Sequence, residues 1–298
     1  MKTLPTVIST TRPPFLLLTP AILSLAYAIS YWQQGFLDFN LSLLVFIAAL
    51  CAHISVNALN EYHDFHSGLD LNTSRTPFSG GSGGLPNNPS AAPAVLLFGL
   101  LSLAVTGIIG LYFISLYGPT LLPIGLIGII LVISYTKFIT RYPWLCLIAP
   151  GLAFGPIFII GSNLVLTGHY SSQALIASLP IFFLVNNLLL LNQFPDQHAD
   201  QQFGRKHIVI AEGKQKSSQL FVYFNLFAYL TLVLAVLLEI LPTEILLGLI
   251  PIVLAFISSR SVIKNHQDIR KLLPAMASNV AINIMTPILM ALGLVWSL

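Results

Sequence analysis

The sequence predicts an all-α, polytopic membrane protein with nine transmembrane helices. The mean hydropathy is +0.85, and 8% of the 298 residues are charged while 56% are hydrophobic. Roughly a quarter of the residues are charged in an ordinary soluble domain, so the composition excludes that class. Because the spans use most of the chain, we expect a single transmembrane domain over residues 1–298.

Apolar segments of suitable length follow one another along the whole chain. A helix needs about 20 mostly apolar residues to cross ~30 Å of hydrocarbon. Segments that meet this length lie at 14–32, 41–60, 92–116, 119–136, 143–166, 173–194, 218–240, 242–259 and 275–297. The chemistry of the protein must therefore reside in the short connections or at the ends of the helices.

The basic residues lie on one side of these nine spans. All 13 Lys and Arg residues fall in the N-terminal tail or in an even-numbered connection. The odd connections, QQGFLDFN, YGP, GHYSSQ and LPTE, contain none. Because Lys and Arg beside a span are retained in the cytoplasm, we expect a cytoplasmic N-terminus and a C-terminus on the opposite side.

Two acidic clusters follow the second and sixth spans, at the ends predicted to be cytoplasmic. They read NALNEYHDFHSGLD at 57–70 and NQFPDQHADQQFGRK at 192–206. Each contains an Asn followed four residues later by an Asp, namely Asn60 and Asp64, and Asn192 and Asp196. The same pair of Asn and Asp thus occurs twice with the same spacing, four helices apart. This suggests an internal pseudo-repeat whose two halves form one site.

The spacing of the polar residues predicts a metal site. Residues four apart on a helix differ by about 40° in azimuth, so Asn192, Asp196 and Asp200 form a stripe, and Asn60, Glu61 and Asp64 share a face over one turn. Carboxylate and amide oxygens favour a hard ion such as Mg²⁺, which takes its other ligands from water and phosphate. A diphosphate substrate is therefore expected. The alternative is a pair of solvated helix ends without a ligand.

Cations and glycines beside the clusters support an anionic substrate. The cations are Arg75, Lys137, Arg141, Arg205 and Lys206. Carboxylates that hold a metal, together with cations that contact the oxygens, stabilise a departing diphosphate. The glycine-rich run FSGGSGGLP at 78–86 either directs backbone N–H groups at an anion or is a flexible linker.

Both clusters resemble the two Asp-rich motifs of the UbiA-type intramembrane prenyltransferases. The details RTPFSGGSG and FPD…AD are most similar to the branch with the 1,4-dihydroxy-2-naphthoate polyprenyltransferases of menaquinone synthesis. Two departures stand out: Glu61 replaces the usual Asp, and Gly68 replaces the third Asp of the first motif, with Asp70 two residues further on. The resemblance implies nine helices around a central cavity with a cytoplasmic cap, formed by Asp-rich loops at 60–90 and 192–216.

The resemblance also implies roles for individual residues. The implied Mg²⁺ ligands are Asn60, Glu61, Asp64, Asp70, Asn192, Asp196 and Asp200. The implied catalytic residues are Asp64, Asp196, Asp200, Lys137 and Arg75, and the donor would also contact Asn60, Asn192, Arg141, Arg205 and Lys206.

The implied reaction is Mg²⁺-dependent transfer of an isoprenoid chain from an allylic prenyl diphosphate to an aromatic acceptor in the membrane. We expect 1,4-dihydroxy-2-naphthoate as the acceptor; 4-hydroxybenzoate, homogentisate or another lipophilic compound is the alternative, and a secondary transporter is the non-enzyme alternative. A CDP-alcohol phosphatidyltransferase would carry one compact motif with Asp-Gly and Ala-Arg, which we do not find. The expected partners are the donor, the acceptor and membrane lipid, with no nucleic acid, in a bacterial or archaeal cell (inner) membrane.

Overall fold

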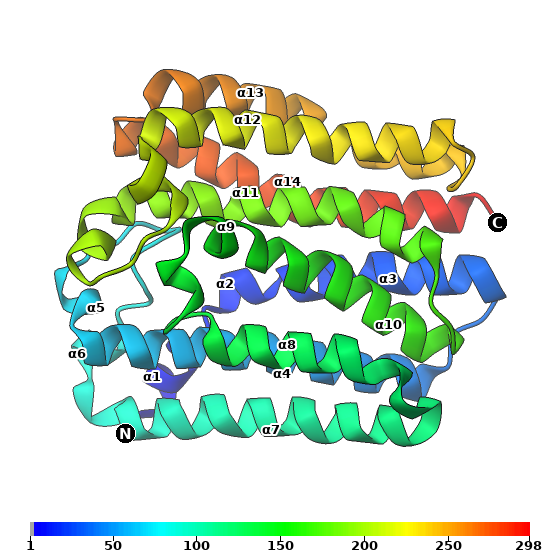
Figure 1. The fold of residues 1–298 in the computed structure, drawn as a ribbon, viewed down its shortest axis with the longest axis horizontal. Helices are drawn as coiled ribbons and strands as arrows, with labels where there is room; N and C mark the ends of the chain where they lie inside the picture. Colours follow the sequence, from blue (N-terminus) through cyan, green and yellow to red (C-terminus); the bar gives the residue numbers. More distant parts are fainter. Residues whose placement is uncertain (1–2) are drawn as a thin grey trace.

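The computed structural model describes residues 3–298, and every regular element in that range is helical. The long helices lie side by side along one direction, so that their ends gather at two ends of the molecule (Figure 1). They are α3 (Leu18–Gln34), α4 (Phe39–Ser67), α7 (Ala92–Tyr117), α8 (Leu122–Ser134), α9 (Pro143–Leu152), α10 (Phe158–Thr167), α11 (Ser172–Gln202), α12 (Ile208–Leu237), α13 (Ile252–Asn265) and α14 (Ile269–Trp296). The short elements are α1 (Thr3–Thr10), α2 (Pro13–Leu16), α5 (Leu69–Asn72), α6 (Gly84–Asn87), the π-helical turn η4 (Ala153–Ile157), and the 3-10 turns η1 (Pro89–Ala91), η2 (Gly118–Leu121), η3 (Ile139–Arg141) and η5 (Thr243–Leu249).

Eight segments of the described chain are long and apolar enough to cross a membrane. One of them, Pro89–Ser134, has 46 residues and contains both α7 and α8, which reverse direction at η2 and run antiparallel (Figure 1). The segments therefore account for the nine spans expected from the sequence. The prediction of an all-α integral membrane protein is confirmed.

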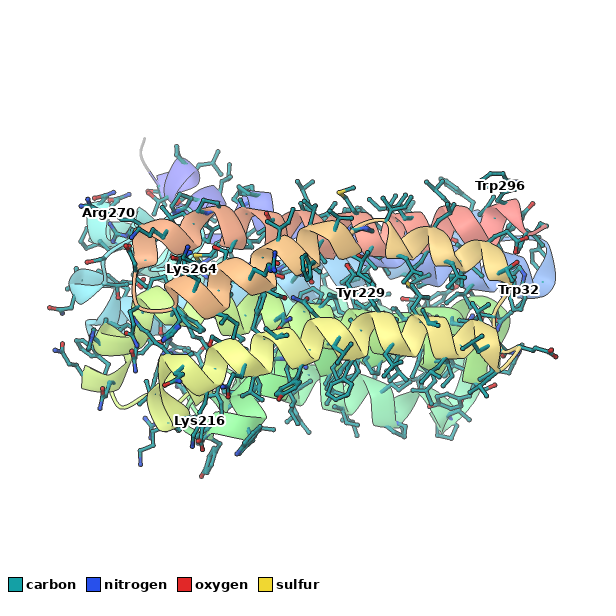
Figure 2. The ribbon with its side chains drawn as sticks, turned by 90° about the horizontal axis from the view of Figure 1, so that it is seen from above. Trp32, Lys216, Tyr229, Lys264, Arg270 and Trp296 are labelled. Atoms are coloured by element: carbon teal, nitrogen blue, oxygen red, sulfur yellow. The ribbon has the colours of Figure 1, made fainter. Side chains whose placement is uncertain are left out.

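The two ends of the bundle differ in their side chains. Lys216, Lys264 and Arg270 lie at one end, whereas Trp32 and Trp296 lie at the other (Figure 2). The short helices α5 and α6 are also at the basic end (Figure 1). Trp is typical of membrane interfaces and Lys and Arg of cytoplasmic ends, so the arrangement supports the predicted orientation, which stays a prediction.

Helix α4 ends at Gly68, within the first acidic cluster. The N-cap Asp38 accepts a hydrogen bond from the backbone N of Leu41 at 2.8 Å, and Gly68 terminates the helix with a φ of 85°. Glycine has no Cβ, so it adopts this left-handed conformation without steric cost. The chain turns into α5 at this point, and Asp70 is thereby returned to the bundle and buried.

The helix formed by α9, η4 and α10 packs closely on α11. The backbone N of Gly151 donates to Asn186 Oδ1 at 2.6 Å, and a Cβ on Gly151 would be 2.2 Å from the carbonyl oxygen of Phe182. Pro150 and Pro156 lack the backbone N–H that donates the hydrogen bonds of a regular helix. The helix widens into the π-turn η4, which begins after Pro150 and includes Pro156. A Cβ on Gly155 would likewise be 2.9 Å from the backbone N of Phe182, so both glycines permit close packing on α11. Ala153 and Phe154 of the π-turn line the interior cavity.

Candidate active site

A cavity of about 230 Å³ joins both acidic clusters to the apolar interior. Its polar end is lined by Arg12, Asn60, Asp64, Asp70, Asn192, Asp196, Asp200, Arg205 and His207. Its apolar part is lined by Phe15, Leu18, Val56, Leu131, Ala153, Phe154, Phe158 and Leu188, among others. The cavity is thus amphiphilic, with charge at one end and hydrocarbon along the rest.

Helix α4 directs Asn60 and Asp64 into the cavity and Glu61 away from it. Asn60 and Asp64 lie one turn apart on the same face, whereas Glu61 is rotated by about 100° from Asn60. Glu61 is fully buried, yet it is not among the residues that line the cavity. Both of its carboxylate oxygens accept hydrogen bonds from Ser82 at 2.7 Å, and Arg12 Nε donates to Oε1 at 2.8 Å. The shared face expected for all three residues holds for two of them.

Helix α11 supplies the second stripe. Asn192, Asp196 and Asp200 all line the cavity, as their four-residue spacing predicts. Asp196 Oδ2 accepts a hydrogen bond from the backbone N of Gly80 at 3.2 Å. Asp200 is more buried than Asp196 and contacts Arg205 Nη1 at 3.1 Å and His207 Nε2 at 3.1 Å. The two acidic clusters therefore meet at one cavity, as expected from the sequence.

Arg205 joins the two acidic helices. Its guanidinium donates to Asp64 on α4 and to Asp200 on α11. Burial by itself would lower the pKa of Arg205, but the negative charges of Asp64 and Asp200 raise it above its ordinary value. Arg205 is thus a permanent positive charge that compensates for the repulsion between the two carboxylates.

Asp70 and the glycine-rich loop complete the polar end. Asp70 is 4% exposed, and a Cβ on Gly81 would be 2.9 Å from Asp70 Oδ1. Burial, followed by the negative charges of Glu61 and Asp64, raises the pKa of Asp70 to about 7. Backbone N–H groups of the loop bind carboxylates of the protein itself, at Asp196 and Glu61. The loop is therefore fixed in place, and the flexible-linker alternative does not describe it.

The donor set at this end fits Mg²⁺. Asp70 Oδ2 and Asp196 Oδ1 are buried without a hydrogen-bond partner among the described residues, and a buried acceptor of this kind is costly unless a ligand satisfies it. The described His, Cys, Asp and Glu residues form no cluster of three that could hold an ion by themselves. Mg²⁺ is commonly bound through one or two carboxylates, with substrate phosphate and water as the other ligands, which suits carboxylates spread around a cavity.

Four of the expected cations do not line the cavity. The side chains of Arg75, Lys137, Arg141 and Lys206 are exposed. Arg75 Nη2 instead donates to the backbone oxygen of Asp70 at 3.2 Å, and the backbone N of Lys206 donates to the oxygen of Thr140 at 2.8 Å. They surround the polar end from outside, so any contact with a substrate requires them to reorient.

Three basic residues that line the cavity lie outside the set expected from the sequence, namely Arg12, His53 and His207. Arg12 has a φ of 53°, which interrupts the helical conformation between α1 and α2. Its guanidinium donates hydrogen bonds to Glu61 and Asn60. His53 precedes Asn60 by seven residues, about two helical turns, so its place on the cavity face could have been read from spacing. His53 Nδ1 lies 2.8 Å from Thr19 Oγ1, and its ring packs edge-on against Phe154.

Comparison with known proteins gives consistent matches. The sequence model described as the UbiA prenyltransferase family matches residues 17–281. The chain is 28% identical over 224 residues to 1,4-dihydroxy-2-naphthoate octaprenyltransferase of Bacillus subtilis (strain 168), and the alignment covers 72% of this chain and 67% of that protein.

Two solved structures share the fold over nearly the whole chain. The apo structure of a UbiA homologue from Aeropyrum pernix K1 has a TM-score of 0.69 at 13% identity and covers 96% of this chain and 98% of that one. A UbiA homologue from Archaeoglobus fulgidus bound to DMAPP and Mg²⁺ has a TM-score of 0.57 at 13% identity and covers 98% and 100%. At these identities the likeness concerns the fold.

Proposed function

The chain belongs to the UbiA prenyltransferase family, so it is a prenyltransferase, and from this premise we propose that it transfers an isoprenoid chain from an allylic prenyl diphosphate to 1,4-dihydroxy-2-naphthoate with Mg²⁺ as cofactor. One observation carries the proposal most directly. A single cavity joins a carboxylate- and arginine-lined end to an apolar interior, which matches the two halves of a prenyl diphosphate.

The polar end would hold Mg²⁺ and the diphosphate. Asp64, Asp70, Asp196 and Asp200 would bind the metal with the amide oxygens of Asn60 and Asn192. When bound, Mg²⁺ would supply positive charge that stabilises the departing diphosphate. Arg12 and Arg205 add fixed positive charges at the same end, and these are most effective toward an anion in a cavity that excludes water.

The apolar part would hold the prenyl chain and the acceptor. The allylic carbon–oxygen bond breaks, the diphosphate leaves with the electron pair, and an electron-rich ring carbon of the acceptor forms the new bond. The attacked carbon then loses the proton it carried, or CO₂ where it carried the carboxylate, and the bonding electrons stay in the ring, which becomes aromatic again. Phe15, Phe154 and Phe158 line this part of the cavity, so the walls suit a flat aromatic ring and shield the allylic cation from water.

The naphthoate acceptor rests on two supports. The loop TPFSGGSGGLP resembles that branch, and the octaprenyltransferase of Bacillus subtilis, named for this acceptor, is 28% identical. We also propose that residues 1–298 act as one domain in a bacterial or archaeal cell membrane among its lipids, with the polar end facing the cytoplasm.

Mass spectrometry of products tests the proposal. Purified protein is given Mg²⁺, labelled geranylgeranyl or farnesyl diphosphate, and a panel of 1,4-dihydroxy-2-naphthoate, 4-hydroxybenzoate and homogentisate. Prenylated naphthoate supports the assignment. Prenylation of only another aromatic compound would refute 1,4-dihydroxy-2-naphthoate as the acceptor and would still support the prenyl-transfer reaction.

A further inference from the structure

We propose that Glu61 is a positioning residue that holds the glycine-rich loop over the polar end of the cavity, and that it is not a ligand of the metal. We call residues 78–86 the cover loop. The inference rests on the proposed function for the meaning of the site, because the cover loop closes the end of the cavity where the diphosphate would bind.

The contacts of Glu61 leave little capacity for a metal ion. Oε1 accepts from the backbone N of Ser82 at 2.7 Å and from Arg12 Nε at 2.8 Å, while Oε2 accepts from Ser82 Oγ at 2.7 Å. The side chain is 0% exposed. Arg12 neutralises the charge of Glu61, and both carboxylate oxygens of Glu61 already accept hydrogen bonds. By contrast, Asp70 and Asp196 each have one buried oxygen without a hydrogen-bond partner in the part of the chain that the structure describes.

Glu61 connects two segments that are far apart in the chain. Arg12 ends the N-terminal segment that begins with α1, and Ser82 is the centre of the cover loop. The same two segments also touch directly, since a Cβ on Gly84 would be 2.4 Å from Ser9 Oγ. The carboxylate of Glu61 on α4 therefore binds both the cover loop, through Ser82, and the N-terminal segment, through Arg12.

The fastened loop is placed where it can act on the site. Ser79, Gly80 and Gly81 line the cavity, and the backbone N of Gly80 donates to Asp196 at 3.2 Å. The loop thus donates one hydrogen bond to Asp196, whose carboxylate a bound ligand would engage. It also donates two hydrogen bonds from Ser82 to Glu61, outside the cavity, and we call these two bonds the Glu61 tie. The Glu61 tie can keep the loop in position while the hydrogen bond to Asp196 is replaced by contacts between Asp196 and a ligand.

The length of the Glu61 side chain agrees with this role. Glu61 leaves α4 about 60° from Asp64, toward Arg12 and the cover loop rather than into the cavity. The sequence has Glu where the related motif usually has Asp, so the carboxylate extends one methylene further. The departure from the motif therefore has a structural reason.

Hydrogen–deuterium exchange on the purified, metal-free protein tests the tie without any assay of activity. We expect backbone amides of residues 78–86 to exchange about tenfold faster in Glu61→Gln and in Ser82→Ala than in the wild type. Glu212→Gln is the matched control, because Glu212 pairs with Lys216 at 2.8 Å on the exposed side of α12. Unchanged exchange of the cover loop in both test variants would overturn the proposal.

Calorimetric titration with Mg²⁺ in the presence of inorganic diphosphate separates the tie from metal ligation. The tie predicts that Glu61→Gln and Ser82→Ala change the Mg²⁺ affinity to a similar and small extent, within about threefold. A loss of tenfold or more in Glu61→Gln alone would identify Glu61 as a ligand and refute the tie. If the wild type binds no Mg²⁺ and diphosphate, the proposed function fails, and the exchange experiment still decides the role of Glu61.

Discussion

The guanidinium of Arg205 is paired with the carboxylate of Asp64, which lies 141 residues earlier in the chain. The same guanidinium also contacts Asp200. In the absence of metal, this arginine is the positive charge that allows carboxylates from α4 and α11 to approach each other. It anchors the connection after α11 to the end of α4.

Replacement of Arg205 by Ala should destabilise the metal-free protein more than the metal-bound protein. Removing one partner of a mostly buried ion pair costs about 3–5 kcal/mol of unfolding free energy, and Mg²⁺ can supply part of the missing charge. Thermal unfolding in EDTA and in Mg²⁺ measures the difference. Arg141→Ala, an exposed arginine, should change neither. Equal losses in both conditions would disprove the compensating role.

Asp196→Asn should abolish turnover while leaving the protein folded. The amide keeps an oxygen that can accept from the N of Gly80, but it lacks the charge that a metal ligand supplies, so we expect at least a roughly 100-fold loss of activity. Asp268→Asn is the matched control, since Asp268 caps α14 at the surface and Asn is an equally good cap. Wild-type turnover in Asp196→Asn would show that Asp196 is not a ligand.

Asp70 should make the metal-free protein less stable as the pH rises. Its pKa of about 7 exceeds the ordinary value of about 4, so the folded state binds this proton more tightly than the unfolded state. The contribution to stability is present in full below about pH 4 and is lost as the pH rises through about 7. The midpoint of thermal unfolding in EDTA should fall over this range in the wild type. An identical fall in Asp70→Asn would contradict the assignment.

The orientation can be tested with introduced cysteines. Gln202 at the polar end and Ser172 at the opposite end are both exposed. In intact cells, a membrane-impermeant thiol reagent should label Ser172→Cys and should spare Gln202→Cys until the cells are opened. The unmodified protein controls for Cys51 and Cys146. The reverse pattern would invert the predicted topology.

The sequence was sufficient to predict the spans, the stripe on α11 and the common face of Asn60 and Asp64, because these depend on local periodicity. Its placement of Glu61 on that same face was wrong. Four-residue spacing fixes the common face of Asn192, Asp196 and Asp200 whatever surrounds the helix. The position of Asp70 was not predicted, although it has a local cause in the structure, since Gly68 ends α4.

The partners of the polar residues could not be predicted in the same way. Glu61 is held by Arg12 and by Ser82, and this pairing is a consequence of tertiary packing that leaves no periodic trace in the sequence. The direction of Lys137 and Arg141 likewise depends on the conformation of a short connection rather than on a helical face. The sequence therefore predicted which carboxylates and amides line the cavity better than it predicted which cations do.

Release of diphosphate from a prenyl diphosphate is the most direct test of the central claim. Purified protein in lipid vesicles, supplied with 1,4-dihydroxy-2-naphthoate, should release one diphosphate for each prenylated ring when Mg²⁺ is present and none when EDTA replaces it. With Mg²⁺, Asp196→Asn should release diphosphate at least roughly 100-fold more slowly than the wild type. If the folded wild-type protein releases no diphosphate and prenylates no aromatic compound with Mg²⁺, the account of this cavity as a prenyl-transfer site is contradicted.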